Sequence, residues 1–404
     1  MKQKQDPSLA KIMAAVLFVG AVAYGVVRFS QWLNEDIILG AIEKSAPDKI
    51  DMAKELAAKG DTAEAKKALR PIVARVKSDS VTPRALMLMA QLEQESGNTE
   101  TALALLKRAV DEFPTSPDQP RAATTYGRLL EDLGRIADAK QVYSAVRATA
   151  QPALRGAAVA GLARLAERAG ELVEARDLYR QAVADSEWDS PEWNLALDGL
   201  GRLNVHFIFS QEETPESEPY IVAPGDSLNR IGVRLNTTQG MLIRANGIED
   251  PSKLRPGQRL KHTPTDFRII IERSTCRLFL LGKNTLFKRY SVGLGMPGDE
   301  TTLGSYTIGN KMKDPTWYRP GGSPVPPGDP ENELGTRWMP LVPNAEGLPT
   351  SLGIHGTNKP ETVGNYSSLG CARLVPEDVE ELYDLVVRGT PVEIVENFGP
   401  ERVG

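Results

Sequence analysis

Cysteine and histidine are scarce in this sequence of 404 residues. The two cysteines, Cys276 and Cys371, are too few for a scaffold held together by several disulfides. The three histidines, His206, His262 and His355, stand at no spacing typical of zinc ligands. We therefore expect neither a structural metal site nor a bound cofactor.

An excess of positive charge is also absent, since the chain has 48 Lys and Arg residues and 53 Asp and Glu residues, for a net charge of −5. A broad attraction to nucleic acid is therefore excluded, and we expect no nucleic-acid partner. The contents of glycine (35 residues) and proline (29 residues) are ordinary for a globular protein, which excludes a collagen-like or wholly disordered chain. The length exceeds one typical domain of about 100–200 residues, so we expect a multidomain protein.

One stretch near the N terminus contains no charged residue. Residues 12–27 are uncharged and lie between Lys11 and Arg28. As a helix they would span about 24 Å of a hydrocarbon core of about 30 Å, and the flanking basic residues can snorkel. We interpret residues 1–34 as a cytoplasmic tail and a transmembrane helix that anchors the protein in a membrane. A secretory signal cleaved at Ala21-Val22-Ala23 is the alternative. Both interpretations place the rest of the chain outside the cytoplasm, in the cell envelope.

Residues 35–209 repeat one helical pattern. A glycine is followed by a small residue, a bulky residue and an apolar residue at constant spacing. The copies are Gly60/Ala65/Leu69/Ile72, Gly97/Ala102/Leu106/Ala109, Gly134/Ala139/Tyr143/Val146 and Gly170/Ala175/Tyr179/Ala182. Because the glycines are 37, 37 and 36 residues apart, the pattern predicts stacked helical hairpins. It resembles the tetratricopeptide repeat, which implies an all-α solenoid that binds a protein partner or acts as a spacer.

Residues 210–219 are rich in glutamate and predict a solvated linker. Residues 220–263 then show the spacing of a strand, two short helices and a closing strand. Asp226 and Ser227 would cap the first helix, and Asn246-Gly247 would turn the chain before the last strand. This segment resembles a LysM domain, a small α/β module of βααβ order. The resemblance implies binding to the glycan strands of peptidoglycan, and a module for protein contacts is the alternative.

The sequence pattern of the C-terminal region, residues 266–397, predicts mainly β-strands. Cys276 alternates with two leucines in one of them, so we interpret it as a buried packing residue. Cys371 instead stands in a turn of small residues that leads into a helix near Pro376. His355 precedes Cys371 by 16 residues. A thiol with a nearby imidazole can act as an activated nucleophile.

Both residues belong to longer motifs. These motifs are Thr302-x-Gly304-x-Tyr306, Asn332-x-Leu334-Gly335-x-Arg337-Trp338, His355-Gly356-Thr357 and Ser368-x-Gly370-Cys371-x-Arg373. The region resembles the catalytic domain of bacterial L,D-transpeptidases, which implies a mainly-β, sandwich-like fold. It also implies that a thiolate attacks the third residue of a peptidoglycan tetrapeptide stem and expels D-alanine. Transfer of the acyl group to an amine would then cross-link two stem peptides.

The same resemblance implies roles in catalysis. His355 would be the general base, and the Gly356 carbonyl would hold its ring. The backbone N–H groups of Gly370 and Cys371 would face the developing oxyanion. Leu369 stands where many relatives have a second histidine, so its side chain offers the oxyanion no hydrogen bond. Carbapenems would acylate the active cysteine.

Further residues would bind the substrate. Arg373 would form a structural pair or hold a substrate carboxylate, and Ser368 belongs to the same motif. Residues 312–350 are dense in proline and glycine, which is typical of a flap that covers a substrate. Tyr318 and Trp338 would line the donor groove or pack beneath this flap.

The sequence therefore predicts a membrane-anchored L,D-transpeptidase of the bacterial envelope, whose partners are peptidoglycan stem peptides and glycan strands. Two other functions are compatible with the motifs. Water could replace the amine, which would give an L,D-carboxypeptidase or an amidase. The chain could also be a non-catalytic peptidoglycan-binding scaffold, although the presence of both Cys371 and His355 argues against this.

Overall fold

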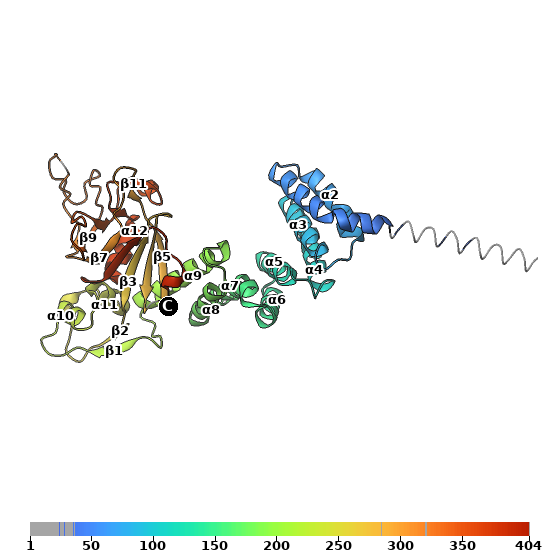
Figure 1. Ribbon diagram of the computed structural model, residues 1–404. Helices are drawn as coiled ribbons and strands as arrows, with labels where there is room; N and C mark the ends of the chain where they lie inside the picture. Colours follow the sequence, from blue (N-terminus) through green and yellow to red (C-terminus); the bar gives the residue numbers. More distant parts are fainter. Residues whose placement is uncertain are drawn as a thin grey trace, which may run out of the picture. The chain divides into compact units, whose positions relative to one another are not determined.

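The computed structural model describes residues 24, 28, 35, 37–283, 285–319 and 321–403 (Figure 1). The chain divides into two units, one that ends at Gly161 and one that begins at Leu162. The membrane segment predicted at residues 12–27 lies outside the described residues, apart from Tyr24. Among the helices that are described, none is long and apolar enough to cross a membrane.

The first unit consists of helical hairpins, as the repeat pattern predicts. Its helices are residues 37–58, α2 (Thr62–Arg75), α3 (Thr82–Glu95), α4 (Thr99–Asp111), α5 (Gln119–Asp132), α6 (Ile136–Thr149) and the start of α7 (Pro152–Arg168). The four repeated glycines have φ between 74° and 84°, which a side chain would strain. The bulky position fills a gap between helices. The Tyr143 ring lies over Gly127 and Gly161, where an added Cβ would be 2.6 and 2.5 Å from it.

The second unit starts with the last helices of the repeat region, which include α8 (Leu172–Asp185) and α9 (Pro191–Phe209). Helix α9 lies beside β5 (Thr285–Ser291), an edge strand of the largest sheet (Figure 1). Val205 and Ile208 of α9 belong to the same buried core as that sheet. The helical region predicted at residues 35–209 is therefore divided between the two units, because α9 buries its apolar face against the sheet.

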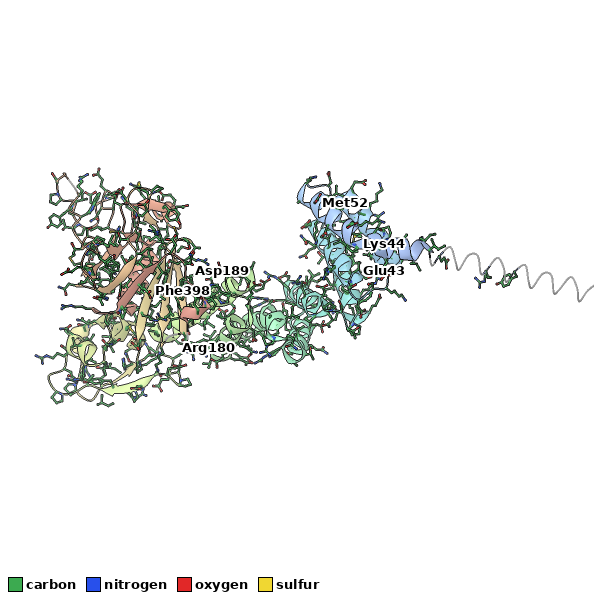
Figure 2. All side chains as sticks on the ribbon, in the orientation of Figure 1. Glu43, Lys44, Met52, Arg180, Asp189 and Phe398 are labelled. Carbon is green, nitrogen blue, oxygen red and sulfur yellow. The ribbon has the colours of Figure 1, made fainter. Side chains whose placement is uncertain are left out.

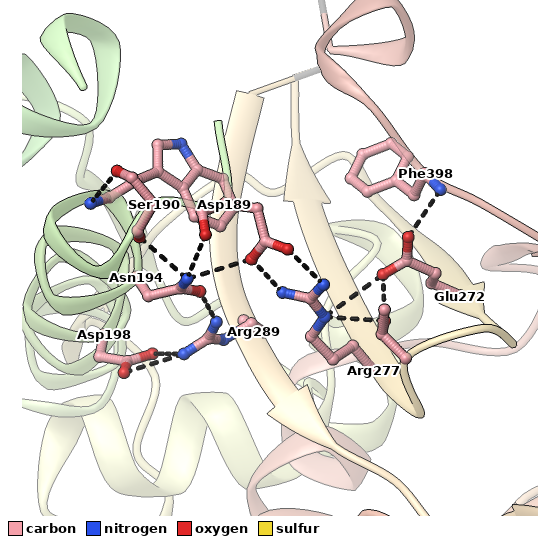
Figure 3. A network of polar contacts seen from close by, with 10 residues as sticks. Asp189, Ser190, Asn194, Asp198, Glu272, Arg277, Arg289 and Phe398 are labelled. Atoms are coloured by element: carbon pink, nitrogen blue, oxygen red, sulfur yellow. Dashed lines mark hydrogen bonds and ion pairs between the residues drawn. The ribbon is translucent and has the colours of Figure 1, made fainter. Parts of the chain in front are cut away.

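Ion pairs reinforce the junction between the α8–α9 region and the sheet. Arg277 Nη2 lies 2.8 Å from Asp189 Oδ2, just before α9, and Arg289 Nη2 lies 2.9 Å from Asp198 Oδ1 (Figure 3). Arg289 also donates to the side-chain oxygen of Asn194. The two arginine side chains are mostly buried. These contacts hold the edge of the sheet against α9, the helix that precedes the βααβ module described below.

We expect Arg289→Met to destabilise the second unit by roughly 1–2 kcal/mol, because Asp198 and the Asn194 side-chain oxygen lose a mostly buried arginine, while the 54% exposure of Asp198 limits the loss. Arg180→Met is the matched control. Arg180 pairs with Asp177 on α8, and their side chains are 52% and 57% exposed (Figure 2), so the expected cost is under about 0.5 kcal/mol. Tryptophan fluorescence during urea unfolding measures both variants, since every described tryptophan lies in the second unit. Equal midpoints for the two variants would show that the junction adds no stability.

Residues 218–262 form the predicted βααβ module. Its elements are β1 (Glu218–Ile221), α10 (Leu228–Arg234), α11 (Gln239–Asn246), the 3₁₀ turn η1 (Pro251–Lys253) and β2 (Arg259–His262), with β1 and β2 antiparallel. Ser227 caps α10 as predicted. Asp226 instead accepts the Tyr220 hydroxyl at 2.6 Å, because its side chain faces back toward β1. The turn predicted at Asn246-Gly247 is present and has a left-handed glycine.

This module packs against α9 and the C-terminal domain. Met241 of α11 is part of the core of the large sheet. The buried Lys261 ammonium donates to the carbonyl of Ser210, just after α9, at 2.7 Å. The acidic segment between them is mostly exposed, as predicted, yet Glu216 pairs with Arg176 at 2.9 Å. Deleting the module would open the core at α11, so a deletion would not test glycan binding alone.

The C-terminal domain is mainly β, as predicted. Its other elements are β3 (Phe267–Glu272), β4 (Arg277–Gly282), β6 (Leu294–Gly295), β7 (Gly304–Ile308), β8 (Met312–Lys313), β9 (Arg337–Pro343), β10 (Gly353–His355), η2 (Pro360–Thr362), β11 (Tyr366–Ser368), β12 (Ala372–Arg373), α12 (Pro376–Leu385), β13 (Pro391–Val395) and η3 (Pro400–Arg402). The main sheet has the order β12-β10-β9-β7-β13-β3-β4-β5, β8 pairs with β9, and β6 pairs with β11. Within the described residues these strands form one nine-stranded sheet and a separate two-stranded sheet.

Cys276 is buried, as predicted, but the prediction that it lies in a strand is wrong. Strand β4 begins one residue later, and Cys276 has a left-handed φ of 51°. Its N–H donates to the carbonyl of Arg273 at 3.3 Å, which closes a turn before the strand. Burial raises the pKa of the Cys276 thiol. The residue therefore packs in the core as an un-ionised side chain.

Candidate active site

The register of neighbouring strands brings the predicted site residues together. His355 at the end of β10 pairs with Trp338 on β9 and with Arg373 on β12. Ala372 pairs with Ile354, so Cys371, one residue before β12, lies opposite the first residue of β10. Side chains alternate along a strand, and directly paired residues share a face. Cys371 and His355 therefore lie on the same face of adjacent strands.

His355 is held in one tautomer by the backbone. Its side chain is buried, and Nδ1 lies 2.7 Å from the carbonyl oxygen of Gly356. Because a carbonyl can only accept, we assign the hydrogen to Nδ1, and Nε2 has the lone pair that can accept a proton. Burial lowers the pKa of His355 to about 4, although the Gly356 carbonyl opposes this effect. The imidazole is therefore neutral near pH 7.

Two glycines allow close packing around this ring. The Trp338 indole lies over Gly353, where a Cβ would clash with the ring. The Trp338 and His355 ring centroids are 5.6 Å apart. A Cβ on Gly356 would be 3.2 Å from the carbonyl oxygen of Leu334, so the flap runs directly against this residue. Trp338 thus covers the imidazole and is partly exposed.

Cys371 lies in the loop between β11 and β12. Its Sγ lies 3.7 Å from the carbonyl oxygen of Ser351. Burial raises the pKa of the Cys371 thiol, while the Gly353 N–H and Arg373 lower it. At rest the pair is therefore a neutral thiol and a neutral imidazole, and the thiolate forms only when the proton is transferred.

Ser368 shapes the loop around the thiol. Its hydroxyl donates to the carbonyl of Cys371 at 2.7 Å and accepts from the Gly370 N–H at 3.2 Å. Gly370 has a φ of 108°, which disfavours any other residue. In the described part of the chain, the Cys371 N–H has no hydrogen-bond partner. The Cys371 N–H is thus available to an oxyanion, whereas the Gly370 N–H is already engaged. The Leu369 side chain is 72% exposed and offers no donor.

Arg373 is a buried cation beside the thiol. Its side chain donates to the carbonyl of Ser367, and its Nε is buried without a partner. No carboxylate of the described residues lies within 4.0 Å of its guanidinium nitrogens. Burial lowers the pKa of Arg373, whereas the Glu333 carboxylate raises it. A buried cation without an ion-pair partner at contact distance is suited to bind an anionic group of a substrate.

Comparison with known proteins identifies the family of this site. A family model of the YkuD L,D-transpeptidase catalytic domain matches residues 266–394. A putative L,D-transpeptidase of Bacillus subtilis, YqjB, is 33% identical over 135 residues, which cover 33% of this chain and 74% of that protein. The chain belongs to the L,D-transpeptidase family. The putative L,D-transpeptidase YkuD of Bacillus licheniformis is 29% identical over 181 residues, which cover 43% of this chain and 97% of the relative.

The other parts of this L,D-transpeptidase family member match separate models. A LysM domain model matches residues 220–262, and two tetratricopeptide repeat models match residues 50–117 and 93–156. Among solved structures, an L,D-transpeptidase from Mycobacterium smegmatis is 15% identical with a TM-score of 0.26. That similarity covers 34% of this chain and 63% of the solved chain.

Among the described residues, the structure gives no contact between Tyr318 and the other predicted site residues. Its side chain is 77% exposed on the flap. The flap itself is folded, because Trp317 and Val325 exchange backbone hydrogen bonds of 2.9 and 2.8 Å. Buried Asn332 donates to the carbonyl of Pro315 at 2.9 Å and ties the two ends of the flap together.

Sequence reasoning missed three groups at the site. The Gly353 N–H and the Ser351 carbonyl act through the backbone, which no side-chain motif indicates. The third is Glu333, whose carboxylate raises the pKa of both His355 and Arg373. It lies inside a quoted motif, between Asn332 and Leu334, and its charge was the available signal.

Proposed function

We propose that this chain is a peptidoglycan L,D-transpeptidase with Cys371 as the nucleophile and His355 as the general base. One observation supports the proposal most: a buried, neutral imidazole, whose Nδ1 is held by the Gly356 carbonyl, shares a sheet face with the thiol of a family member. Such a pair needs no resting thiolate, because the base accepts the proton as the sulfur attacks.

The first half-reaction transfers an acyl group to the enzyme. Cys371 Sγ attacks the carbonyl of the third stem residue, and its proton passes to His355 Nε2. The Cys371 N–H stabilises the oxyanion of the tetrahedral intermediate. The bond to D-alanine then breaks, and the imidazolium protonates the leaving amine. The product is a thioester on Cys371.

The second half-reaction releases the acyl group. An acceptor amine attacks the thioester carbonyl and gives a proton to His355. The carbon–sulfur bond breaks, and the imidazolium returns a proton to the thiolate. The result is an amide that joins two stem peptides. Both steps use the same base, as reversible proton transfer requires.

We assign substrate binding to residues around this pair. Arg373 would hold a stem carboxylate, since it is buried and its Nε has no hydrogen-bond partner among the described residues. Trp338 would line the donor groove beside His355, and Tyr318 would meet the substrate from the exposed flap. Ser368 would act by holding the loop of Cys371, because both of its hydrogen bonds are made within that loop.

The other domains would place the enzyme on its substrate. The LysM domain supports binding to the glycan strands of peptidoglycan, and the family supports a place in the cell envelope. We propose that residues 1–34 anchor the chain in the membrane and that the repeats of residues 35–209 bind a protein partner or set the distance to the wall. The segment at 210–219, the LysM domain at 220–263 and the catalytic domain at 266–397 would follow.

Muropeptides with tetrapeptide stems distinguish the candidate functions. We expect the full chain to release D-alanine and to produce cross-linked dimers, measured by mass spectrometry. Tripeptide monomers without dimers would indicate water as the acceptor and an L,D-carboxypeptidase. Unchanged muropeptides, together with binding to sacculi, would indicate a peptidoglycan-binding scaffold.

A further inference from the structure

The Gly356 carbonyl, which holds the imidazole of His355, belongs to a residue that is itself tightly held. The Gly356 N–H donates to the carbonyl of Arg337 at 3.2 Å. A Cβ added to Gly356 would lie 3.3 Å from Val379 of α12 and 3.3 Å from the Cα of Gly335. Gly356 therefore packs against both α12 and the segment that leads into β9, and this close approach favours glycine.

Glu380 of α12 holds the residues that precede and begin β9. Its carboxylate accepts from the Thr336 hydroxyl at 2.7 Å and lies 3.6 Å from Nη1 of Arg337. The same Arg337 nitrogen donates to the Thr336 carbonyl at 2.8 Å. The Arg337 side chain is mostly buried, and its guanidinium lies over the Tyr383 ring of α12, 5.4 Å from the centroid. Residues 336 and 337 are thus attached to α12 by their side chains.

These contacts form one path from α12 to the base. The side chains of Thr336 and Arg337 are held by Glu380, and the Arg337 carbonyl accepts from the Gly356 N–H. The Gly356 carbonyl in turn lies 2.7 Å from Nδ1 of His355. Helix α12 follows the strand that leaves the nucleophile loop, so one helix is attached to the surroundings of both reacting groups.

We propose that Glu380 is a positioning residue of the acyl transfer: by holding residues 336 and 337 on α12, it keeps the Gly356 carbonyl on Nδ1 of His355. The proposal rests on the proposed function, in which Nε2 accepts the proton of Cys371. If the carbonyl shifts, the hydrogen can move to Nε2, and that tautomer cannot accept a proton there. The Glu380 side chain is 44% exposed, so its loss should cost less than the loss of the base itself.

The tautomer of His355 can be measured directly by NMR of the full-length protein with ¹⁵N-labelled histidine. The spectrum of His355→Ala identifies its signals. We expect the wild type to show the Nδ1–H form and Glu380→Ala to show a mixture with the Nε2–H form. Thr336→Val removes the donor and should give the same mixture. In Glu380→Gln the amide oxygen can still accept from Thr336, so this variant should keep the wild-type tautomer.

The rate at which iodoacetamide alkylates Cys371 at neutral pH gives a second measurement, in variants that also have Cys276→Ala. We expect Glu380→Ala to slow alkylation by roughly three- to tenfold, because the base is displaced in part of the molecules. Adding Thr336→Val should slow it no further, since both changes break the same hydrogen bond. Neither measurement consumes peptidoglycan, so unchanged muropeptides would refute the proposed function and leave this test readable.

Glu381 is the matched control, because it is the next residue of α12 and its contacts lead away from the base. Its carboxylate accepts from the Tyr290 hydroxyl at 2.7 Å and pairs with Lys288, and its side chain is 18% exposed. Glu381→Gln should therefore reduce stability at least as much as Glu380→Ala, yet keep the wild-type tautomer and rate. Equal changes in the two variants would indicate an effect of stability alone and overturn the proposal, as would an unchanged tautomer in Glu380→Ala.

Discussion

Cys371→Ala is expected to abolish both D-alanine release and cross-link formation from tetrapeptide muropeptides. The acyl group can reach an acceptor only through the thioester, and in the described chain Cys371 is the one cysteine that is not buried. Losing the nucleophile removes the covalent route, and binding by Arg373 or Trp338 cannot replace it. Product analysis by mass spectrometry should show unchanged tetrapeptide stems.

Cys276→Ala is the matched control for that variant. Cys276 packs in the core of the large sheet, so its loss should cost on the order of 1–2 kcal/mol of stability and leave turnover largely intact. Both cysteines are free, and we expect active enzyme to contain no disulfide between them. Equal loss of turnover in the two variants would refute the assignment of the nucleophile, as would that disulfide in a non-reducing mass spectrum of active enzyme.

His355→Ala is expected to slow the acylation of Cys371 by a carbapenem by roughly 10²- to 10⁴-fold, the range typical of a lost general base. In this reaction the sulfur attacks the strained lactam carbonyl, the carbon–nitrogen bond opens, and the ring nitrogen takes the proton that His355 accepted. Intact-protein mass spectrometry measures the rate, and peptide mapping locates the adduct. The exposed Leu369 provides no donor to the oxyanion, so the Cys371 N–H must supply this stabilisation.

The pH dependence separates the loss of a base from a loss of structure. Burial lowers the pKa of His355 to about 4, so above about pH 5 the base is unprotonated and the wild-type rate should be nearly constant through the neutral range. Without His355 only the ionised thiol reacts. Burial raises the pKa of the Cys371 thiol, so the rate of His355→Ala should rise about tenfold per pH unit. A flat profile in the variant, or an adduct on Cys276, would show that His355 is not the base.

Local patterns in the sequence were sufficient for several parts of this protein. The helical repeats follow from glycines that end helices with positive φ, which act within one turn of the chain, and from a bulky residue whose spacing predicts that it is buried between helices. The LysM elements follow from a cap at Ser227 and a turn at Gly247. The spacing of His355 and Cys371 indicated the chemistry, because each belongs to a short motif with its own backbone requirement.

Other features of the catalytic domain depend on contacts that no local pattern contains. The left-handed turn at Cys276 looked like a strand, since burial alone produces the same alternation of side chains. The Ser368 hydroxyl is used within its own loop, and the Nε of Arg373 is buried without a hydrogen-bond partner, because of how that loop folds against the sheet. A motif names these side chains but does not indicate which atoms they meet.

The contacts between α9 and the catalytic sheet show the limit most clearly. Helix α9 has the periodicity of a solenoid helix. Nevertheless, its Asp198 pairs with Arg289, which is 91 residues away in the sequence, and its Asn204 donates to the carbonyl of Phe287, which is 83 residues away. The periodicity of α9 predicts that one face is buried, but it does not say against what. The sequence by itself therefore determined the elements, the family motifs and the reacting pair. Only the tertiary structure decided that α9 and the LysM domain pack on the catalytic sheet and that Leu334 and Gly335 lie against Gly356, next to the base, because such contacts form between residues that only the complete fold brings together.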